Sequence, residues 1–267
     1  MGLAHSPSIS QDGLLFAVDA ANPRCYSGAG TSANDLLLFG PLPVNQPVKL
    51  RPNSVTTDNN QPQDPVAGTL TNGVGFTSEN GGAFTFDGTD DYIVFNSETL
   101  NPGFPTSMLC WFKIDQNSSS QGIFSLRWHS TRYYGFFLNV NASAKLSMQI
   151  GDGGSAGSGA RRTGQRAAAN VDTGRWYHGA FVWNALVEDM VMYIDGEPQT
   201  LTYSGTGDKL FYGAASTATD PATWPQRIGV LNDKYLDGSV AQILFYGRAL
   251  TKKEILNHYE ATKKRFI

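Results

Sequence analysis

The sequence predicts an all-β protein, an antiparallel β-sandwich or barrel with one short α-helix near its C-terminus. From Ala83 onward, about ten short apolar or alternating segments are separated by turn residues at intervals of about 8–12 residues. The chain contains 29 glycines and 13 prolines, and 12% of its residues are aromatic against 16% charged. No helical periodicity separates the apolar segments, which excludes a parallel βαβ architecture.

The N-terminal part of the chain predicts one strand followed by a long irregular segment. Residues 13–19 form a continuous apolar run that ends before Asn22-Pro23, so we expect a buried strand there after an N-terminal tail at 1–12. Six of the thirteen prolines fall between 40 and 69, and each fixes φ and removes an N–H donor. This segment is therefore expected to be an extended arm on a neighbouring subunit or a surface insertion within one domain, 13–267.

The remaining strands follow from short apolar or alternating runs between turn residues. They are expected at 83–87, 92–95, 107–114, 122–128, 134–140, 145–150, 176–183, 190–195, 226–231 and 240–246. The run at 107–114 is almost entirely apolar, which is typical of a strand that is covered on both faces. Gly196 after Asp195 marks a hairpin turn.

One helix is predicted to begin at Thr251. Thr251 and Glu254 have the spacing of a capping box, and Leu250 can pack against Ile255 as a hydrophobic staple. Ile255, Leu256 and Tyr259 would form the stripe that faces the sandwich, whereas we expect His258 to be exposed. The basic residues at 263–265 are expected to form a solvated end.

Composition excludes several function classes. With 20 basic and 23 acidic residues the formal net charge is −3, and no basic block suggests nucleic-acid binding. No run of about 18 apolar residues predicts a membrane span, and Met1–Gln11 lacks the pattern of a signal peptide, so we expect synthesis in a cytoplasm. Cys25 and Cys110 are too few for a disulfide framework and are expected to be buried free thiols.

The sequence offers no catalytic constellation. A glycoside hydrolase needs two carboxylates that face each other, but the six glutamates form no paired pattern within a strand. None of the four histidines accompanies a nucleophile motif, and His178 within an apolar strand is expected to be a hydrogen-bonded core or rim residue. We therefore expect a protein that is not an enzyme.

Two groups of residues are candidate binding sites. Asp87, Asp90 and Asp91 supply hard oxygen donors in one turn, so calcium is the metal they would hold, although the same residues also make an ordinary tight turn. Trp128, Tyr133, Tyr134 and Trp224 can stack on sugar rings, although core or subunit-interface packing is the alternative for each of these aromatics.

Three segments together resemble a known family. They are Phe86-Asp87-Gly88-Thr89-Asp90-Asp91-Tyr92-Ile93, the stretch from Gly174-Arg175-Trp176-Tyr177-His178 to Ile194-Asp195-Gly196-Glu197, and Leu236-Asp237-Gly238 through Arg248-Ala249-Leu250-Thr251. In order and spacing they resemble the laminin-G-like jelly-roll domains of the concanavalin A-like lectin/glucanase superfamily. The opening from Gly13 to Thr31 is similar to the form found in structural proteins of tailed bacteriophages.

The resemblance implies a jelly-roll β-sandwich and, as the leading hypothesis, a non-enzymatic virion component. It would be a surface protein of the head or tail, such as a capsid decoration or tail-fibre part, in an oligomeric assembly with other virion proteins. The contact residues would come from the apolar run and the arm: Leu36, Leu37, Leu38, Phe39, Pro41 and Pro43. The alternative is a lectin-like module or adhesin for host surface glycans. Ala241-Gln242 stands where calcium-binding members often have Ile-Asp, which weakens the metal inference.

Overall fold

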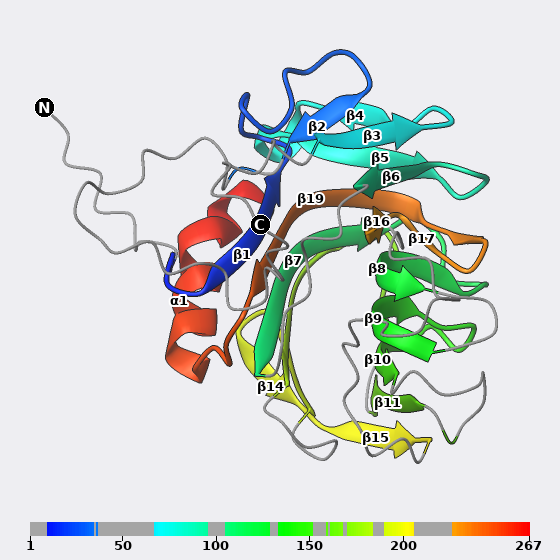
Figure 1. Cartoon of the computed structure of the whole chain (residues 1–267), viewed down its shortest axis with the longest axis vertical. Helices are drawn as coiled ribbons and strands as arrows, with labels where there is room; N and C mark the ends of the chain where they lie inside the picture. The colour runs from blue at the N-terminus through cyan, green and yellow to red at the C-terminus, as the bar shows by residue number, and fades with distance from the viewer. Residues whose placement is uncertain are drawn as a thin grey trace, which may run out of the picture.

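The computed structural model describes residues 10–34, 36, 67–95, 105–128, 133–151, 159, 161–167, 170–183, 190–205 and 226–267. Of residues 67, 127, 128, 133 and 134 only the backbone is described. Figure 1 shows the two layers that these residues form, with the curved strands β7 and β19 facing the strands β8–β11. All strand pairs among the described residues are antiparallel, as the sequence predicts.

The first layer is an eight-stranded sheet in the order β14-β13-β12-β7-β19-β5-β4, with β1 beside β19. Its strands are β1 (Leu14–Asp19), β4 (Gly75–Thr77), β5 (Ala83–Asp87), β7 (Thr106–Ile114), β12 (Trp176–Trp183), β13 (Met190–Ile194), β14 (Glu197–Gln199) and β19 (Asp237–Tyr246). The pairing of β1 with β19 places the first strand of the described chain beside the last one.

The second layer is a nine-stranded sheet in the order β15-β11-β10-β9-β8-β16-β6-β3-β2. Its strands are β2 (Ser32–Asn34), β3 (Ala67–Thr71), β6 (Tyr92–Phe95), β8 (Gln121–Trp128), β9 (Tyr133–Val140), β10 (Leu146–Gly151), β11 (Arg161–Arg166), β15 (Leu201–Ser204) and β16 (Gln226–Ile228). A separate hairpin joins β17 (Val230–Leu231) to β18 (Lys234–Tyr235), and a short 3-10 turn, η2, spans Glu79–Gly81. The segment predicted as an arm at 40–69 ends inside β3, and its described part is 67–69.

The main core fills the space between the two sheets. In β7, Met108, Cys110 and Phe112 point into this core, while Leu109 and Trp111 point to the opposite face of the sheet. Both faces of β7 are covered, which explains why the run at 107–114 is apolar without alternation. Cys25 and Cys110 are buried and form no disulfide, as predicted.

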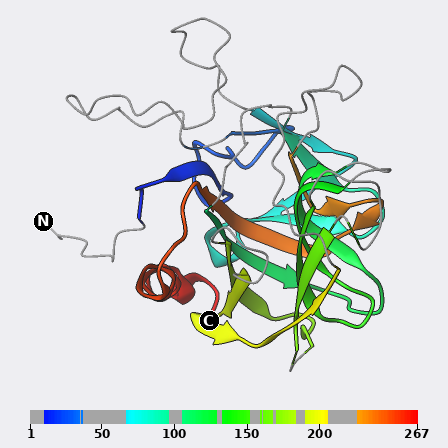
Figure 2. The ribbon, with the colours of Figure 1, turned by 60° about the horizontal axis from the view of Figure 1, so that its bottom comes forward.

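The outer face of the eight-stranded sheet is covered by α1 (Lys252–Thr262) and the 3-10 turn η5 (Lys263–Arg265) (Figure 2). The capping box is present, because the Thr251 hydroxyl accepts from the Glu254 backbone N–H and the Glu254 carboxylate accepts from the Thr251 N–H. Leu250 and Ile255 belong to one apolar cluster, in agreement with the predicted staple.

One expectation for this region is wrong, and another holds only in part. His258 was expected to be exposed but is only 3% exposed, because Ile255, His258 and Thr262 share the helix face that meets the sheet. The basic end of the chain is solvated at Lys264, as expected, but it also packs on the sheet. Arg265 forms an ion pair with Asp19, and the Phe266 ring stacks on Trp111 with centroids 4.2 Å apart.

Candidate functional site

The predicted glycan-stacking residues are only partly placed by the structure. Trp128 and Tyr133 are register partners where β8 and β9 meet, and Tyr134 follows on β9. The side chains of these three residues, and the whole of Trp224, lie outside the described residues. Stacking at this end of the sandwich therefore stays a prediction.

The predicted partner-binding segment is described at one residue. The Leu36 side chain is half-buried and packs against the main core and against the apolar cluster beneath α1. Part of its surface is therefore used within its own chain. The other residues of this prediction, Leu37, Leu38, Phe39, Pro41 and Pro43, lie outside the described residues, and their contact with a partner stays a prediction.

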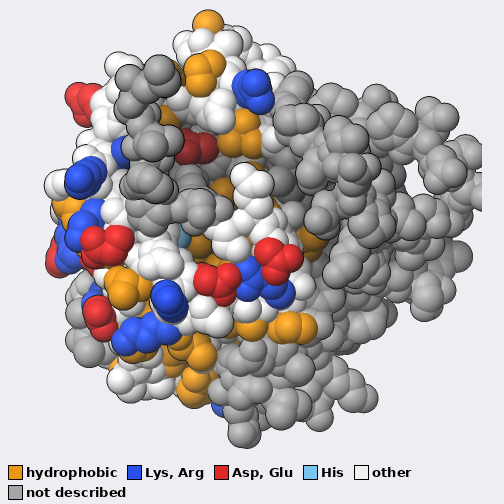
Figure 3. Space-filling model, turned by 90° about the vertical axis from the view of Figure 1, so that its left-hand side faces the viewer, with side chains coloured by type: hydrophobic (Ala, Val, Ile, Leu, Met, Phe, Trp, Pro, Cys, Tyr) orange, Lys and Arg blue, Asp and Glu red, His pale blue; other side chains and the backbone are white. Residues whose placement is uncertain are grey.

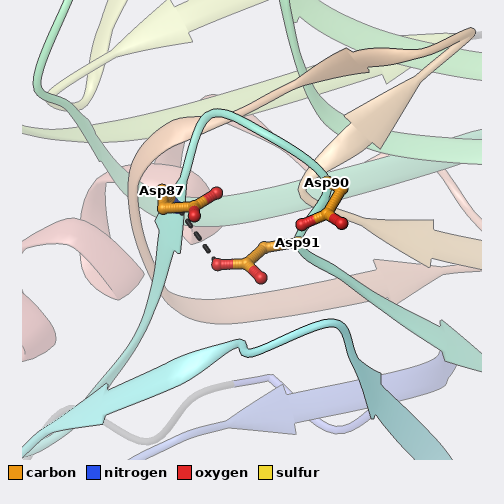
Figure 4. A group of neighbouring side chains, drawn as sticks. All are labelled: Asp87, Asp90 and Asp91. Atoms are coloured by element: carbon orange, nitrogen blue, oxygen red, sulfur yellow. Dashed lines mark hydrogen bonds between the residues drawn. The ribbon is translucent and has the colours of Figure 1, made fainter.

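The three predicted metal ligands do come together in the turn between β5 and β6 (Figure 4). One carboxylate oxygen from each of Asp87, Asp90 and Asp91 lies within 4.8 Å of the others. The Asp87 carboxylate accepts from the Thr89 N–H at 2.8 Å, and the Asp91 carboxylate accepts from the Asp87 N–H at 3.2 Å. Asp87 and Asp90 are exposed, whereas Asp91 is 3% exposed and its second oxygen, Oδ1, has no hydrogen-bond partner.

The charges at this turn are poorly compensated. Burial raises the pKa of the Asp91 carboxyl, and the charges of Asp87 and Asp90 raise it further, against the hydrogen bond from Asp87. Asp237 lies opposite Asp87 in the β5–β19 register, and burial together with the charges of Asp115 and Asp87 raises the pKa of its carboxyl. A cation near these carboxylates would relieve their mutual repulsion.

The same turn borders an open depression of about 530 Å³ at one end of the sandwich. Four connections line it: the β5–β6 turn, the β7–β8 loop, the β9–β10 turn and the β17–β18 hairpin. The lining residues are Gly88, Thr89, Ser118, Ser119, Ser120, Ala142, Asp233, Lys234 and Tyr235. We call this feature the loop-end depression. Its lining is rich in hydroxyls and carries one carboxylate, one ammonium and one aromatic ring.

Two glutamines hold the serine loop of the depression in place. The Gln116 side-chain carbonyl accepts from the N–H and the hydroxyl of Ser118, each at 2.9 Å, and its amide donates to the Ser119 hydroxyl at 2.8 Å. The fully buried Gln121 side chain donates to the Gln116 backbone carbonyl and accepts from the Asp237 N–H. These bonds connect the loop to the start of β19. They hold the hydroxyls of Ser118 and Ser119 in place before any ligand binds.

The opposite wall is the β17–β18 hairpin, whose shape depends on two residues with positive φ. Asn232 and Asp233 have φ values of 49° and 55°, which is the backbone of a type I′ turn. The hairpin rests on Gly122 of β8, where an added Cβ would lie 2.1 Å from the Leu231 nitrogen. A glycine is therefore required at 122 for the hairpin to close the depression.

The side chains that line the depression can form hydrogen bonds with a ligand. Hydroxyl, ammonium and carboxylate groups together donate and accept hydrogen bonds, as a polyhydroxylated ligand requires. The Asp91 carboxyl, whose pKa is raised, is covered from solvent and so cannot reach a substrate. Sequence reasoning missed these lining residues, although the serine run at 118–120 and Asn232-Asp233 were visible as turn signals.

The fold and the depression define a lectin-type antiparallel β-sandwich. The sequence profile of the Concanavalin A-like lectin/glucanases superfamily matches residues 87–256, more than half of the chain, and the chain belongs to this family. No curated protein sequence matches the chain. No helix of the described residues is long and apolar enough to cross a membrane.

Solved structures of similar fold include a sialidase and a toxin domain. Trypanosoma rangeli sialidase in complex with sialic acid matches with a TM-score of 0.56 and 11% identity, over 97% of this chain and 34% of the sialidase. The receptor binding domain of botulinum neurotoxin C/D mosaic serotype matches with a TM-score of 0.57 and 12% identity, over 93% of this chain and 51% of that domain. The chain thus spans about a third of the sialidase and half of the toxin domain, and at these identities the likeness concerns the fold alone.

The calcium prediction can be tested by thermal unfolding. Asp87, Asp90 and Asp91 would hold the ion, since Ca²⁺ takes carboxylate oxygens readily. We expect 1 mM CaCl₂ to raise the Tm. If this concentration is 100 times the Kd, the free energy of unfolding should increase by about 2.7 kcal/mol. In Asp90→Asn the calcium effect should disappear, while the calcium-free Tm should hold or rise because a charge that repels Asp91 is gone.

The control is Asp233→Asn, which removes an exposed carboxylate outside the trio at a position where asparagine tolerates the positive φ. This variant should keep the calcium response. If the Tm of the wild type does not change when calcium is added to millimolar concentrations, then Asp87, Asp90 and Asp91 form a turn that holds no metal.

Proposed function

We propose that the chain is a non-enzymatic carbohydrate-binding module that holds a sugar in the loop-end depression. The observation that carries the proposal is the depression itself, which is open, lined by hydroxyl and charged side chains, and braced by the bonds of Gln116 and Gln121. Its volume of about 530 Å³ falls in the range of small-molecule sites, about 300–1,000 Å³. An open site of this size admits one or two sugar rings at the end of a longer glycan.

The lining favours a sugar over an apolar ligand. Thr89 and Ser118–Ser120 supply hydroxyls that both donate and accept, while Asp233 and Lys234 add a charged acceptor and donor. Tyr235 supplies an aromatic ring, and such a ring can cover the C–H face of a pyranose. Both similar structures belong to proteins whose names concern sialic acid or a receptor, which agrees with this class of ligand.

The proposal includes the absence of catalysis. Glycoside hydrolysis requires two carboxyl groups about 5–9 Å apart on opposite sides of the scissile bond. Among the described residues, Asp87, Asp90 and Asp91 form a cluster of three carboxylates, and all three belong to one turn. Asp91 is buried, and the Asp87 carboxylate accepts from the Thr89 N–H. Such an arrangement can hold a cation or a hydroxyl, but it does not flank a bond.

The proposal is tested with an immobilised glycan library, followed by calorimetric titration of the best oligosaccharide with and without calcium. We expect Tyr235→Ala to weaken binding at least tenfold, and Ser119→Ala to weaken it severalfold, because each removes a group that faces the depression. Tyr203→Ala is the matched control, since Tyr203 is an exposed tyrosine on β15. Equal affinities of wild type and both depression variants would refute the site, and no binding in the library would refute the function.

The virion role is a separate prediction that rests on the resemblance. It proposes a surface component of a tailed-phage head or tail, located in the particle and bound to other virion proteins. None of the described contacts bears on it. A fixed ratio of this chain to the shell protein in purified particles, measured by mass spectrometry, would support it, and a sugar site in the same chain would be compatible with it.

A further inference from the structure

Two histidines meet in the interface between α1 and the eight-stranded sheet. His178 projects from the middle of β12, and His258 projects from α1 toward it. His178 Nε2 and His258 Nδ1 lie 2.9 Å apart, and the rings stack with centroids 5.0 Å apart. The two side chains are 0% and 3% exposed, so this hydrogen bond crosses a fully buried interface between helix and sheet.

The other two ring nitrogens have no hydrogen-bond partner. His178 Nδ1 and His258 Nε2 are buried and unsatisfied. The neutral pair shares one proton across its hydrogen bond, and any added proton would place a positive charge on one of these unpartnered atoms. Aromatic rings surround the pair, with Trp111 of β7 at 5.2 Å and Tyr259 of α1 at 5.7 Å from the His178 ring.

Several charged groups on the surrounding elements are engaged in contacts away from the two rings. Asp195 accepts from the His178 backbone N–H and pairs with Arg175. On the helix, Glu260 pairs with Lys263, and at the helix start Glu254 pairs with Arg248. At the helix end Arg265 pairs with Asp19, while β19 presents the neutral Gln242, whose amide also bonds to Asp19. Figure 3 shows the face that carries α1, with acidic and basic side chains mixed on its surface.

We propose that the His178–His258 pair is an acid-sensitive latch, which holds α1 and the C-terminal turn on the sheet and releases them when the pair is protonated. Protonation replaces a hydrogen-bonded neutral pair by a buried cation, and among the described residues no carboxylate bonds to either ring. Undocking hydrates both rings and removes that cost. The latch therefore couples the position of the helix to pH.

The direction of the effect follows from proton linkage. Burial lowers the pKa of both imidazoles, to about 3 for His258, with the charge of His258 adding to the effect on His178. In the undocked state both should titrate near the ordinary value of about 6.5. Between these pKa values the undocked state binds more protons than the docked state. The equilibrium constant for docking therefore falls as the pH drops below about 6.5, by up to tenfold per pH unit for each histidine.

Release should be local because the helix is a separate layer outside the sandwich. Its other attachments include the Leu250 and Ile255 cluster, the bond from Trp111 Nε1 to the Thr262 hydroxyl, the Phe266 stack and the Arg265–Asp19 ion pair. The main core between the two sheets contains neither histidine. Loss of the latch would expose Trp111 and the apolar outer face of β7 while the sandwich persists.

The test is amide hydrogen exchange of the full chain between pH 7.5 and 4.5, corrected for the intrinsic exchange rate. We expect the protection of residues 252–266 to fall at least tenfold per pH unit below pH 6.5, while residues 108–112 of β7 stay protected. His258→Gln and His178→Gln, each with a neutral side chain that can hydrogen-bond, should each lower this slope to that of one proton, and the double variant should abolish it. His129→Gln, which removes a histidine outside the described residues, should leave it intact.

Three outcomes would overturn the latch. Protection of α1 could be independent of pH, or β7 and α1 could lose protection together, which would mean global acid unfolding. The slope could also stay at its full wild-type value in whichever glutamine variant folds, which would assign the effect to another group. A loss of protection that is confined to α1, with a slope that is reduced by glutamine at 178 or at 258, supports the proposal.

Discussion

Replacing Gly122 with alanine should destabilise the fold by about 3 kcal/mol and abolish sugar binding. The added Cβ would lie 2.1 Å from the Leu231 nitrogen and 2.4 Å from the Val230 carbonyl carbon, and these backbone atoms cannot rotate away. The β17–β18 hairpin must therefore move off β8. Since Asp233, Lys234 and Tyr235 line the depression from this hairpin, its wall moves with it. Urea unfolding and titration with the library's best oligosaccharide measure both effects.

Gly164→Ala is the control for this substitution. Gly164 also lies in the nine-stranded sheet, on β11, but its nearest neighbours would be side-chain atoms of Leu201, Met190 and Met148 at 3.2 Å or more. These side chains can adjust, so we expect a stability change below about 1 kcal/mol and unchanged binding. Equal stability of the two variants would contradict the packing of the hairpin on Gly122.

Replacing Trp111 with alanine should cost about 4 kcal/mol, the largest single side-chain effect we expect beneath the helix. Its ring is fully buried, stacks on Phe266 and Tyr259, and donates from Nε1 to the Thr262 hydroxyl at 2.8 Å. The substitution leaves a cavity and removes the main contact of the C-terminal turn. Thermal unfolding gives the stability, and hydrogen exchange of residues 252–266 shows whether the helix loosens first.

Trp111→Phe separates packing from hydrogen bonding. It keeps an aromatic ring beside Phe266 and loses the bond to Thr262, so a cost of about 1–2 kcal/mol is expected. Neither variant should change sugar affinity in the fraction that stays folded, because Trp111 lies on the face opposite the main core and does not line the depression. A cost of Trp111→Ala below about 1 kcal/mol would contradict the described packing of the helix.

Much of the fold could be predicted from local patterns. The apolar run at 107–114 predicted a strand, and its lack of alternation follows from the two covered faces of β7. Thr251 and Glu254 predicted the helix start, because a capping box is a local arrangement. The short strand β11 was missed, since Arg161–Arg166 carries three arginines and no apolar alternation, and its pairing with β10 and β15 is a tertiary effect.

The candidate site was less predictable because it is assembled from distant segments. The aspartates of the β5–β6 turn lie within five consecutive residues and were visible together. In contrast, Thr89, Ser119 and Tyr235 are brought side by side only by the sheet order. His258 was placed on the wrong side of the helix for a similar reason, because its partner His178 lies 80 residues away.

The most direct test of the proposed sugar site is a footprint of the bound oligosaccharide by hydrogen exchange or NMR shift mapping on the full chain. Binding in the loop-end depression predicts changes at 88–91, 116–120, 141–145 and 232–237, with the meeting point of β8 and β9 unchanged. Changes centred on Trp128 and Tyr133 instead, at the other end of β8, would contradict this site and favour the aromatic group.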